Sequence, residues 1–355
     1  MSLKNQLIAR IRQDGPMTIA EYIAECLLHP THGYYVSRDP LGAAGDFTTA
    51  PEISQMFGEL IGLCLAQSWL EQGRPDGFEL AELGPGRGTL MSDILRATKG
   101  VPGFHEAAQI TLVEASPTLR DVQAKTLAGY APQWIGTAAE LPEAPLFLVA
   151  NEFFDALPIR QFLRDGQGWC ERLVGVQGET LSFGLGARMP QAALEHRLND
   201  TNEGDLVEIC PSAPLIIAQL TERIATHSGA ALIVDYGDWR SLGDTFQAVR
   251  KHTRTNPLTE PGMADLTAHV DFEALAVAAK IAGCEYTRLT PQGVFLERLG
   301  ITDRAKVLAS GMPESAVENL TGAHRRLTHP DEMGNLFKVL GLYPLQFSPP
   351  PGLEP

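Results

Sequence analysis

A short strand that runs into three alternate glycines constrains the fold of this chain more than any other feature. Residues 78–83 form a mainly apolar run, an amphipathic run begins at Thr89, and between them lie Gly84, Gly86 and Gly88. A strand, a tight glycine turn and a helix bring the backbone against a nucleotide-like ligand, because a Cβ in the turn would block close approach or forbid a positive φ. The sequence therefore predicts an α/β protein with a cofactor site at this turn.

Strands and helices alternate beyond the turn. Further short apolar runs have the composition of parallel strands that are buried on both faces: residues 109–114, 134–136, 146–150 and 230–235. A last strand at residues 336–340, paired with residues 286–289, would add an antiparallel edge. We expect a doubly wound, mostly parallel Rossmann-like sheet with an antiparallel edge strand, an N-terminal helical region and insertions.

The same patterns divide the chain into segments. One amphipathic helix is expected from about Pro51 to Gln72, since proline suits the first turn of a helix. The expected segments are an N-terminal helical region with a loop that covers the cofactor (1–75), the first half of the core (76–159), a β-rich insertion (160–200), the second half of the core (201–292), a helical insertion (293–333), and the last core strand with the tail (334–355).

Composition and charge narrow the classes of partner and location. Lys and Arg number 28 against 43 Asp and Glu, a formal charge of −15. This argues against nucleic acid as a partner, because its phosphates need clustered cations, and is compatible with a basic protein substrate.

No apolar run reaches the ~18 residues that would span a membrane. The N-terminus lacks the features of a signal or transit peptide, so we expect a cytoplasmic protein without membrane insertion. The five cysteines are widely spaced without a C-x-x-C pair, so no metal site is expected.

Three cofactor motifs compete for the glycine turn. A dinucleotide motif needs a third glycine where this chain has Thr89, and a phosphate-binding P-loop needs a lysine that is absent. The motif of S-adenosylmethionine (SAM) enzymes, acid-x-Gly-x-Gly-x-Gly, matches Glu82 to Gly88 without a mismatch. The alternative is a glycine turn with a structural role only. The acids after the next strands help to choose between this alternative and a SAM site.

Two acids follow the next two predicted strands. Glu114 ends the strand at 109–114, where a carboxylate can accept both hydroxyls of a ribose. Glu140 follows the strand at 134–136, where an adenine edge would lie. Glu114 in this position favours SAM as the cofactor, whereas Glu140 could equally be a solvated acid at a helix end.

A second polar group follows the strand at 146–150. Asn151, Glu152 and Asp155 come at the carboxyl end of that strand, beside the first, where open α/β sheets bind ligands. Polar side chains are costly to desolvate there unless they are used, so these residues are candidates to face a methyl acceptor. The alternative is that Asn151 and Asp155 cap the following turn.

The order of the motifs supports a family resemblance. The motifs are GDFTTAPEIS at 45–54, ELGPGRG at 82–88, NEFFDALP at 151–158, GDTFQA at 243–248 and ADLTAHVDF at 264–272. In this order the chain closely resembles the MidA-like family of class I SAM-dependent methyltransferases, related to the mitochondrial complex I assembly methyltransferase, from about Met17 to Tyr343. The resemblance implies a class I methyltransferase core, SAM as cofactor, and arginine methylation of a protein substrate, with a respiratory complex I subunit as one candidate.

The resemblance also favours roles for further residues. The segment with Gly45, Thr48 and Thr49 is expected to fold over the cofactor, and the alternative is a loop with a helix cap. A carboxylate of Glu152 or Asp155 can hold a guanidinium bidentately and help one nitrogen lose its proton. His269 is a candidate relay base, and the alternative is a cap or a core contact.

Two other functions stay open at this level. One is a SAM-binding assembly chaperone whose catalysis is weak or lost. The other is a small-molecule O- or N-methyltransferase. This function would be favoured if the acceptor site were a closed pocket and not an open acidic groove.

Overall fold

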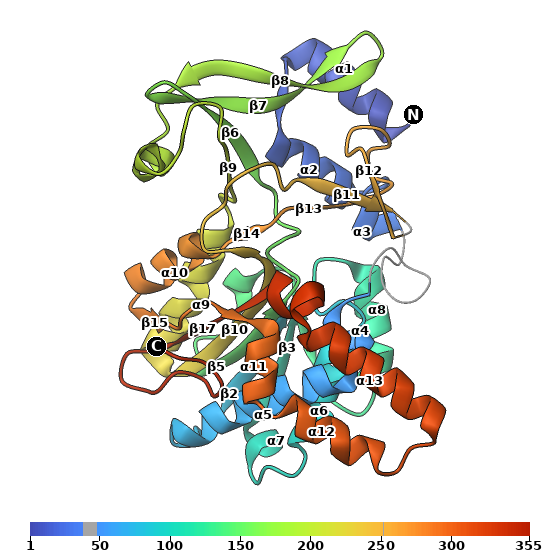
Figure 1. The fold of residues 1–355 in the computed structure, drawn as a ribbon, viewed down its shortest axis with the longest axis vertical. Helices are drawn as coiled ribbons and strands as arrows, with labels where there is room; N and C mark the ends of the chain where they lie inside the picture. The colour runs from blue at the N-terminus through green and yellow to red at the C-terminus, as the bar shows by residue number, and fades with distance from the viewer. Residues whose placement is uncertain (38–47, 251) are drawn as a thin grey trace. The chain divides into compact units, whose positions relative to one another are not determined.

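The structure is a computed structural model that describes residues 1–37, 48–250 and 252–355 (Figure 1). Its internal contacts divide the chain into two discontinuous units, and the chain passes from one to the other directly after Phe154. Unit 1 comprises Met1–Phe47, Asp155–Ala213 and Arg240–Asp271. Unit 2 comprises Thr48–Phe154, Pro214–Trp239 and Phe272–Pro355. Unit 2 therefore begins at Thr48, and the segment boundaries that the sequence suggests stay predictions.

Unit 2 is built on a mostly parallel sheet. Its strands follow the order β15-β17-β10-β5-β2-β3-β4. The parallel strands are β2 (Phe78–Leu83), β3 (Ala108–Val113), β4 (Gln133–Ile135), β5 (Leu146–Asn151) and β10 (Gly229–Asp238). The strand order reverses between β2 and β5, and this is where the ligand site of a doubly wound sheet lies. The predicted doubly wound α/β fold is confirmed.

The antiparallel part of this sheet differs in one detail from the expectation. β17 (Phe337–Pro344) pairs antiparallel with both β10 and β15 (Cys284–Tyr286), and β16 (Thr290–Pro291) also pairs with it. The antiparallel strand thus lies inside the sheet, and β15 forms the edge. Nearly all residues of β17 are buried, and a buried edge would leave backbone N–H and C=O groups without partners, so β17 has a neighbour on each side.

Helices flank the sheet of unit 2, as Figure 1 shows. They are α5 (Gln55–Glu71), α6 (Thr89–Thr98), α7 (Phe104–Ala107), α8 (Pro117–Thr126), α9 (Ala213–His227) and α10 (Phe272–Ile281), with the short helices α4 (Ala50–Ile53) and η1 (Ala138–Glu140). Aromatic rings fill the core between helices and strands, for example Trp69 edge-on to Phe104 at 5.4 Å and Phe78 edge-on to Phe147 at 5.2 Å.

The helix expected from Pro51 to Gln72 is broken in the structure. Ser54 has an extended backbone between α4 and α5, and its Oγ accepts a hydrogen bond from the Met56 backbone N–H at 3.2 Å. A serine at this place offers the backbone an alternative to continuing the helix, so it begins α5 as an N-cap. α4 and α5 are therefore two separate helices with an extended residue between them.

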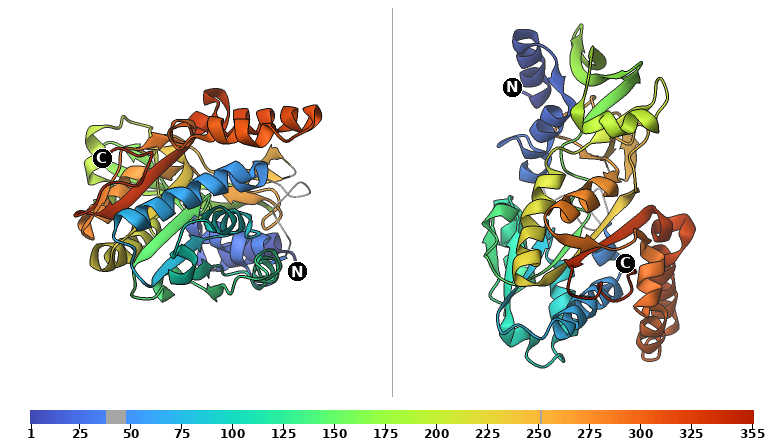
Figure 2. Two further views of the ribbon diagram at one scale, coloured as in Figure 1. Left: turned by 90° about the horizontal axis from the view of Figure 1, so that it is seen from below. Right: turned by 90° about the vertical axis from the view of Figure 1, so that its left-hand side faces the viewer.

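A block of helices is inserted between β16 and β17. It consists of α11 (Gln292–Arg298), α12 (Ile301–Ala309), α13 (Glu314–Thr328) and the single π turn η3 (Pro330–Gly334), drawn from orange to red in Figure 2. Buried Glu59 on α5 anchors the block: its Oε2 accepts from Arg304 Nε at 2.7 Å, while its Oε1 accepts from Arg96 on α6.

In the residues that are described, unit 1 contains two antiparallel sheets and the N-terminal helices. The helices are α1 (Leu3–Asp14), α2 (Ile19–Leu28), α3 (Tyr34–Ser37) and the 3₁₀ helix η2 (Ala192–Asn199). One sheet runs β1 (Met17–Thr18), β7 (Gly168–Gln177), β6 (Arg160–Asp165), β9 (Leu206–Ile209), with β8 (Thr180–Met189) paired to β7. The other runs β12 (Thr253–Thr255), β11 (Gln247–Arg250), β13 (Asp265–Thr267), and β14 (Val270–Asp271) follows it in the chain. Within the parts of both units that the structure describes, no helix is long and apolar enough to cross a lipid bilayer.

Candidate functional site

The glycine turn joins β2 to α6 at the carboxyl end of the parallel strands. Gly84, Gly86 and Gly88 have φ values of 60°, 54° and 81°. A Cβ on Gly84 would lie 2.9 Å from Cδ2 of Phe153, closer than real Cβ contacts. Side chains at these positions would therefore strain the backbone, and at Gly84 would also displace a neighbouring ring. The turn has the positive φ angles that the sequence predicts.

Glu82 lies one residue before the end of β2, and its side chain is only 3% exposed. Burial raises its pKa to about 8, and the charge of Glu114 adds to the effect. Its Oε2 makes no hydrogen bond with any part of the chain that the structure describes. A buried acceptor without a donor is costly, so this carboxyl suits a ligand that supplies an ammonium or hydroxyl group.

Glu114 follows β3 and is held by several donors. Its Oε1 accepts from the Ser116 backbone N–H at 2.7 Å, its Oε2 from Gln123 Nε2 at 3.2 Å, and its backbone carbonyl from Arg120 Nε at 2.8 Å. Burial raises its pKa, and the hydrogen bonds from Ser116 and Gln123 lower it. The acid is thus fixed in orientation beside the glycine turn.

Gln123 is a residue that the sequence analysis missed. It is fully buried on α8, and its Nε2 also donates to the backbone carbonyl of Gly86 at 2.8 Å. The signal that could have found it is a polar residue four positions after Leu119, on the apolar face of an amphipathic helix.

Glu140 has the contacts of a helix cap. Its Oε1 accepts from the Gly136 backbone N–H at 3.1 Å and from the Thr137 backbone N–H at 2.9 Å, which completes a capping box at η1. The side chain is exposed. The contacts favour the structural alternative for this residue, and adenine contact stays a prediction.

Asn151 is the last residue of β5 beside the glycine turn, and Glu152 follows it. Glu152 has φ of 51°, a left-handed conformation that is uncommon for a glutamate. Its backbone N–H donates to the Val234 carbonyl of β10 at 2.9 Å, and its Oε1 accepts from Asn151 Nδ2 at 3.3 Å. Strained backbone that neighbouring strands hold in place concentrates at functional sites.

The segment that was expected to cover the cofactor is described from Thr48 onward, and Gly45 lies outside the described residues. Thr48 and Thr49 are half-buried before α4, and Thr49 makes no capping hydrogen bond through its side chain. The N–H of Ala50, the first residue of α4, donates to Glu152 Oε1 at 3.3 Å. The structure thus brings the start of α4 next to Glu152.

Asp235 ties β10 to the turn after β5. It is fully buried, its Oδ2 accepts from the Phe154 backbone N–H at 3.0 Å, and its Oδ1 accepts from the Tyr236 backbone N–H at 2.9 Å. The Phe153 and Phe154 rings meet edge-on at 5.2 Å. These contacts fix the path of the chain immediately after Glu152.

The other two catalytic candidates, Asp155 and His269, belong to unit 1. The Ala268 backbone N–H donates to the Asp155 carbonyl at 3.0 Å, which places Asp155 next to the His269 segment. Asp155 is buried. Burial and the charges of Asp265 and Asp155 raise the pKa of Tyr35 well above its usual value, and Tyr35 Oη donates to Asp265 Oδ1 at 2.9 Å.

A buried acid that the sequence did not single out holds the His269 segment. The His269 backbone N–H donates to Thr245 Oγ1 at 2.8 Å, and Thr245 Oγ1 donates in turn to Glu208. Glu208 also accepts from Gln161 Nε2 at 2.6 Å, and burial raises its pKa. Two motifs of the family resemblance, around Thr245 and around His269, are therefore joined through one carboxyl of β9.

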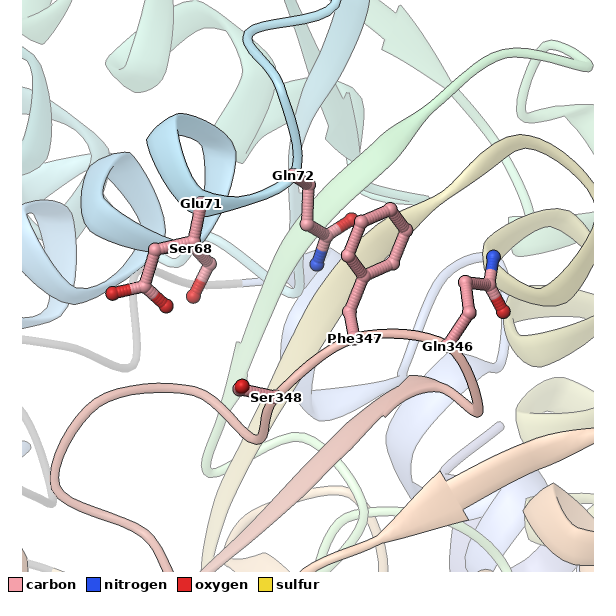
Figure 3. A pocket seen from close by; sticks show the side chains of 6 residues that line it. All are labelled: Ser68, Glu71, Gln72, Gln346, Phe347 and Ser348. Carbon is pink, nitrogen blue, oxygen red and sulfur yellow. The ribbon is translucent and has the colours of Figure 1, made fainter.

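The pocket in Figure 3 lies at the opposite end of the sheet of unit 2. Its volume is about 330 Å³, and the Phe347 ring faces Gln72 across it. The Gln72 side chain exchanges two hydrogen bonds with the backbone of Gly229, at 2.9 and 2.7 Å, where β10 begins. β10 thus begins beside this pocket, whereas the glycine turn lies at the carboxyl ends of the parallel strands, so the pocket is separate from the candidate site.

The residues at the carboxyl ends of the strands fit SAM. Glu82 and Glu114 supply buried acceptors, and SAM presents hydroxyl and ammonium donors. The glycine turn lets a ligand approach the backbone closely. These residues therefore fit the cofactor that the sequence predicts, and their individual contacts with it stay predictions.

Known proteins are similar to this chain over most of its length. Residues 60–290 match a family described as "putative S-adenosyl-L-methionine-dependent methyltransferase". Two relatives are named protein arginine methyltransferase NDUFAF7, mitochondrial. The one from Danio rerio is 40% identical over 96% of this chain and 86% of its own, and the one from Homo sapiens is 38% identical over 96% and 83%. A crystal structure from Burkholderia thailandensis with bound S-adenosyl-homocysteine aligns at a TM-score of 0.83 and 30% identity, covering 96% of this chain and 91% of the other.

These relatives correct one expectation. The sequence analysis expects a cytoplasmic protein, and the curated relatives from frog, human and fly carry the label mitochondrial. The cytoplasmic expectation was wrong because it rested on the absence of a recognisable leader in the first residues, which is weak ground for a location.

Proposed function

Because the chain belongs to this family of SAM-dependent methyltransferases, we propose that it transfers a methyl group from SAM to a guanidinium nitrogen of arginine in a protein substrate. The observation that carries the proposal is Glu152, a carboxylate in a left-handed backbone at the carboxyl end of β5, beside the glycine turn. The names of the relatives support arginine as the acceptor.

The proposed cofactor contacts come from unit 2. The turn of Gly84, Gly86 and Gly88 would accept the close approach of the ligand, Glu82 would pair with an ammonium group, and Glu114 would bind ribose hydroxyls. Thr48 and Thr49 are proposed to contact the cofactor from the start of α4, since Ala50 lies against Glu152. Each of these proposed contacts can be tested by a single substitution.

Bound SAM would supply a methyl group that its sulfonium already activates. What the protein must add is alignment of the acceptor nitrogen with that methyl group. An arginine side chain is protonated in proteins, so its nitrogen must lose a proton as the N–C bond forms and the S–C bond breaks. The Glu152 carboxylate is proposed to hold the guanidinium through two hydrogen bonds and to accept that proton, which leaves methylarginine and S-adenosylhomocysteine.

Asn151, Asp155 and His269 are proposed in supporting roles. Asn151 Nδ2 donates to Glu152 Oε1 and would hold the carboxylate in one orientation. Asp155 is a second acid that follows Glu152 closely in the chain, and it would add negative charge toward a cationic acceptor. His269, anchored through its backbone to Thr245, would relay the proton.

The charge of the chain bears on the class of acceptor protein. The net charge of −15 favours a basic acceptor segment. The resemblance to the complex I assembly methyltransferase makes a respiratory complex I subunit the first acceptor to test.

The test measures methyl transfer and cofactor binding separately. Purified protein is incubated with labelled SAM and arginine-containing peptides, and methylarginine is identified by mass spectrometry. Glu152→Gln should keep the affinity for SAM within about threefold and lower kcat by at least about 100-fold, because it removes the acid without changing its shape. Glu179→Gln, at the exposed β7–β8 turn, is the matched control and should behave as wild type.

Three outcomes would contradict the proposal. Full activity of Glu152→Gln would remove this residue from the mechanism. SAM binding without transfer to any peptide or protein would favour the assembly chaperone, and transfer to small molecules alone would favour a small-molecule methyltransferase.

A further inference from the structure

The amide of Gln123 joins three separate parts of the cofactor half of unit 2. Its Nε2 donates to the carbonyl of Gly86 in the glycine turn at 2.8 Å and to Oε2 of Glu114 after β3 at 3.2 Å. Its Oε1 accepts from Nε1 of Trp134 on β4 at 2.8 Å. Both amide hydrogens and the oxygen are thus used within one fully buried side chain.

Trp134 determines which way this amide points. An indole nitrogen can only donate, so the oxygen of Gln123 must face Trp134. The nitrogen must then face Gly86 and Glu114, and both of these groups are acceptors. An amide turned the other way would set its oxygen against a carbonyl and a carboxylate, so the observed orientation is the only one that satisfies all three partners.

The glycine turn also rests on the helix that carries Gln123. A Cβ on Gly88 would lie 3.6 Å from both Cα and Cγ of Gln123, so α8 lies close beside this glycine. The hydrogen bond from Gln123 fixes the turn at Gly86, two residues before this close approach. The bond to Glu114 fixes the acid relative to the same helix.

We infer that Gln123 is a positioning residue for the cofactor, which holds the glycine turn and the Glu114 carboxylate in the relative placement that SAM binding needs. This role rests on the proposed contact of Glu114 with the ribose. It goes further in one respect: the two halves of the cofactor site are set by one amide rather than independently.

Loss of the amide should also change the pH dependence of cofactor binding. Burial raises the pKa of Glu114, and the hydrogen bonds from Ser116 and Gln123 and the charge of Arg120 lower it. Glu82 on β2 is the other carboxyl whose charge interacts with Glu114, and it is present in wild type and in the Gln123 variant alike. Without the Gln123 donor, the carboxyl should take up a proton at higher pH. A protonated Glu114 is a poorer acceptor for hydroxyl groups, so the loss of cofactor affinity on acidification should begin at higher pH in a variant that lacks the amide.

The test is calorimetric titration of the whole protein with S-adenosylhomocysteine between pH 6 and pH 9. Gln123→Leu should bind about 10- to 100-fold more weakly at pH 8, and its affinity should fall at higher pH than that of wild type. Trp134→Phe keeps an aromatic ring but frees the amide to turn, so it should lose affinity by a smaller factor with the same direction of pH change. The wild-type titration in the same series tests cofactor binding itself, so failure of the proposed function is recognised separately.

A double variant distinguishes positioning from general destabilisation. If Gln123 acts through Glu114, the losses in Gln123→Leu and Glu114→Gln should not add in the combined variant. Wild-type affinity and an unchanged pH profile in Gln123→Leu would overturn the inference, as would additive losses or a pH-independent loss that follows the melting temperature. If Gln123→Leu does not fold, Trp134→Phe decides in the same way, since wild-type binding across the pH range would overturn the inference.

Discussion

Replacement of Glu82 by Gln should stabilise the ligand-free protein at alkaline pH while it weakens cofactor binding. The carboxyl is 3% exposed and one oxygen has no hydrogen-bond partner within the described residues, so its charged form is strongly disfavoured. Its pKa is about 8 in the folded protein, against 4.5 for a glutamate that is exposed to water, as in the unfolded chain. Between these values the folded protein holds a proton that the unfolded chain has released.

The direction and the size of the stability change with pH follow from this difference in pKa. Stability falls as pH rises wherever the folded state binds more protons, so the loss begins near pH 4.5 and is complete above about pH 8. A difference of about 3.5 pH units at about 1.4 kcal/mol each amounts to about 5 kcal/mol. Glu82→Gln removes the titrating group, so its stability relative to wild type should rise by about 4 kcal/mol between pH 5 and pH 9, since part of the loss in wild type has already occurred at pH 5.

The assay is urea unfolding of wild type and Glu82→Gln at pH 5, 7 and 9. The amide can bring a pH-independent cost of its own, of about 1–3 kcal/mol, so the change of the difference with pH is the decisive quantity. Binding of SAM at pH 7 should release a proton in wild type and not in the variant, which calorimetry in buffers of different ionisation enthalpy measures. Glu79→Gln is the matched control: it lies three residues earlier on β2, is buried with a raised pKa, and bonds Thr111 instead.

Two results would refute this reasoning. A stability difference that is the same at pH 5 and pH 9 would show that Glu82 does not titrate in this range. An unchanged SAM affinity in Glu82→Gln, equal to that of Glu79→Gln, would show that the acid is not part of the cofactor site.

Other predictions test separate parts of the molecule. Gly86→Val should lower the affinity for SAM by more than about 100-fold, because a β-branched residue strains a φ of 54°, while circular dichroism stays like that of wild type; unchanged affinity in calorimetry would contradict the cofactor site. Glu208→Leu should lower the free energy of unfolding by about 2–4 kcal/mol, because Thr245 and Gln161 lose their shared acceptor, and urea unfolding with a normal midpoint would disprove the buried network. Arg304→Ala should cost about 1–3 kcal/mol in the same assay and leave SAM affinity unchanged, since it removes a donor from the buried Glu59 carboxyl and loosens α12 from α5; a change in affinity would show that the helical block reaches the cofactor site.

The candidate site was predictable where it rests on local chemistry. The glycines at 84, 86 and 88 predict a turn with positive φ angles, and all three have positive φ in the structure. The acids Glu82 and Glu114 come at the ends of neighbouring strands, and parallel strands bring their carboxyl ends to one edge of the sheet. No long-range information was needed for these predictions.

Other features depended on partners that are distant in the sequence. Glu140 was a candidate for the adenine, and its capping contacts give it a structural role that the sequence left open. Gln123 was missed because its partners, Gly86 and Trp134, lie on other elements. Glu152 has a left-handed backbone, and its N–H donates to the carbonyl of Val234 on β10, a partner that is distant in the sequence.

The sequence by itself determined the α/β class, the parallel strands, the glycine turn and the family motifs, because strand periodicity and glycine backbone preferences are properties of short segments. Only the tertiary structure decided that β17 lies inside the sheet, that Ser54 separates α4 from α5, and that one amide of Gln123 joins the turn to Glu114. The physical reason is that burial and hydrogen bonding depend on residues that folding brings together. The role of a buried polar group is therefore determined by the partners that it contacts in the folded protein.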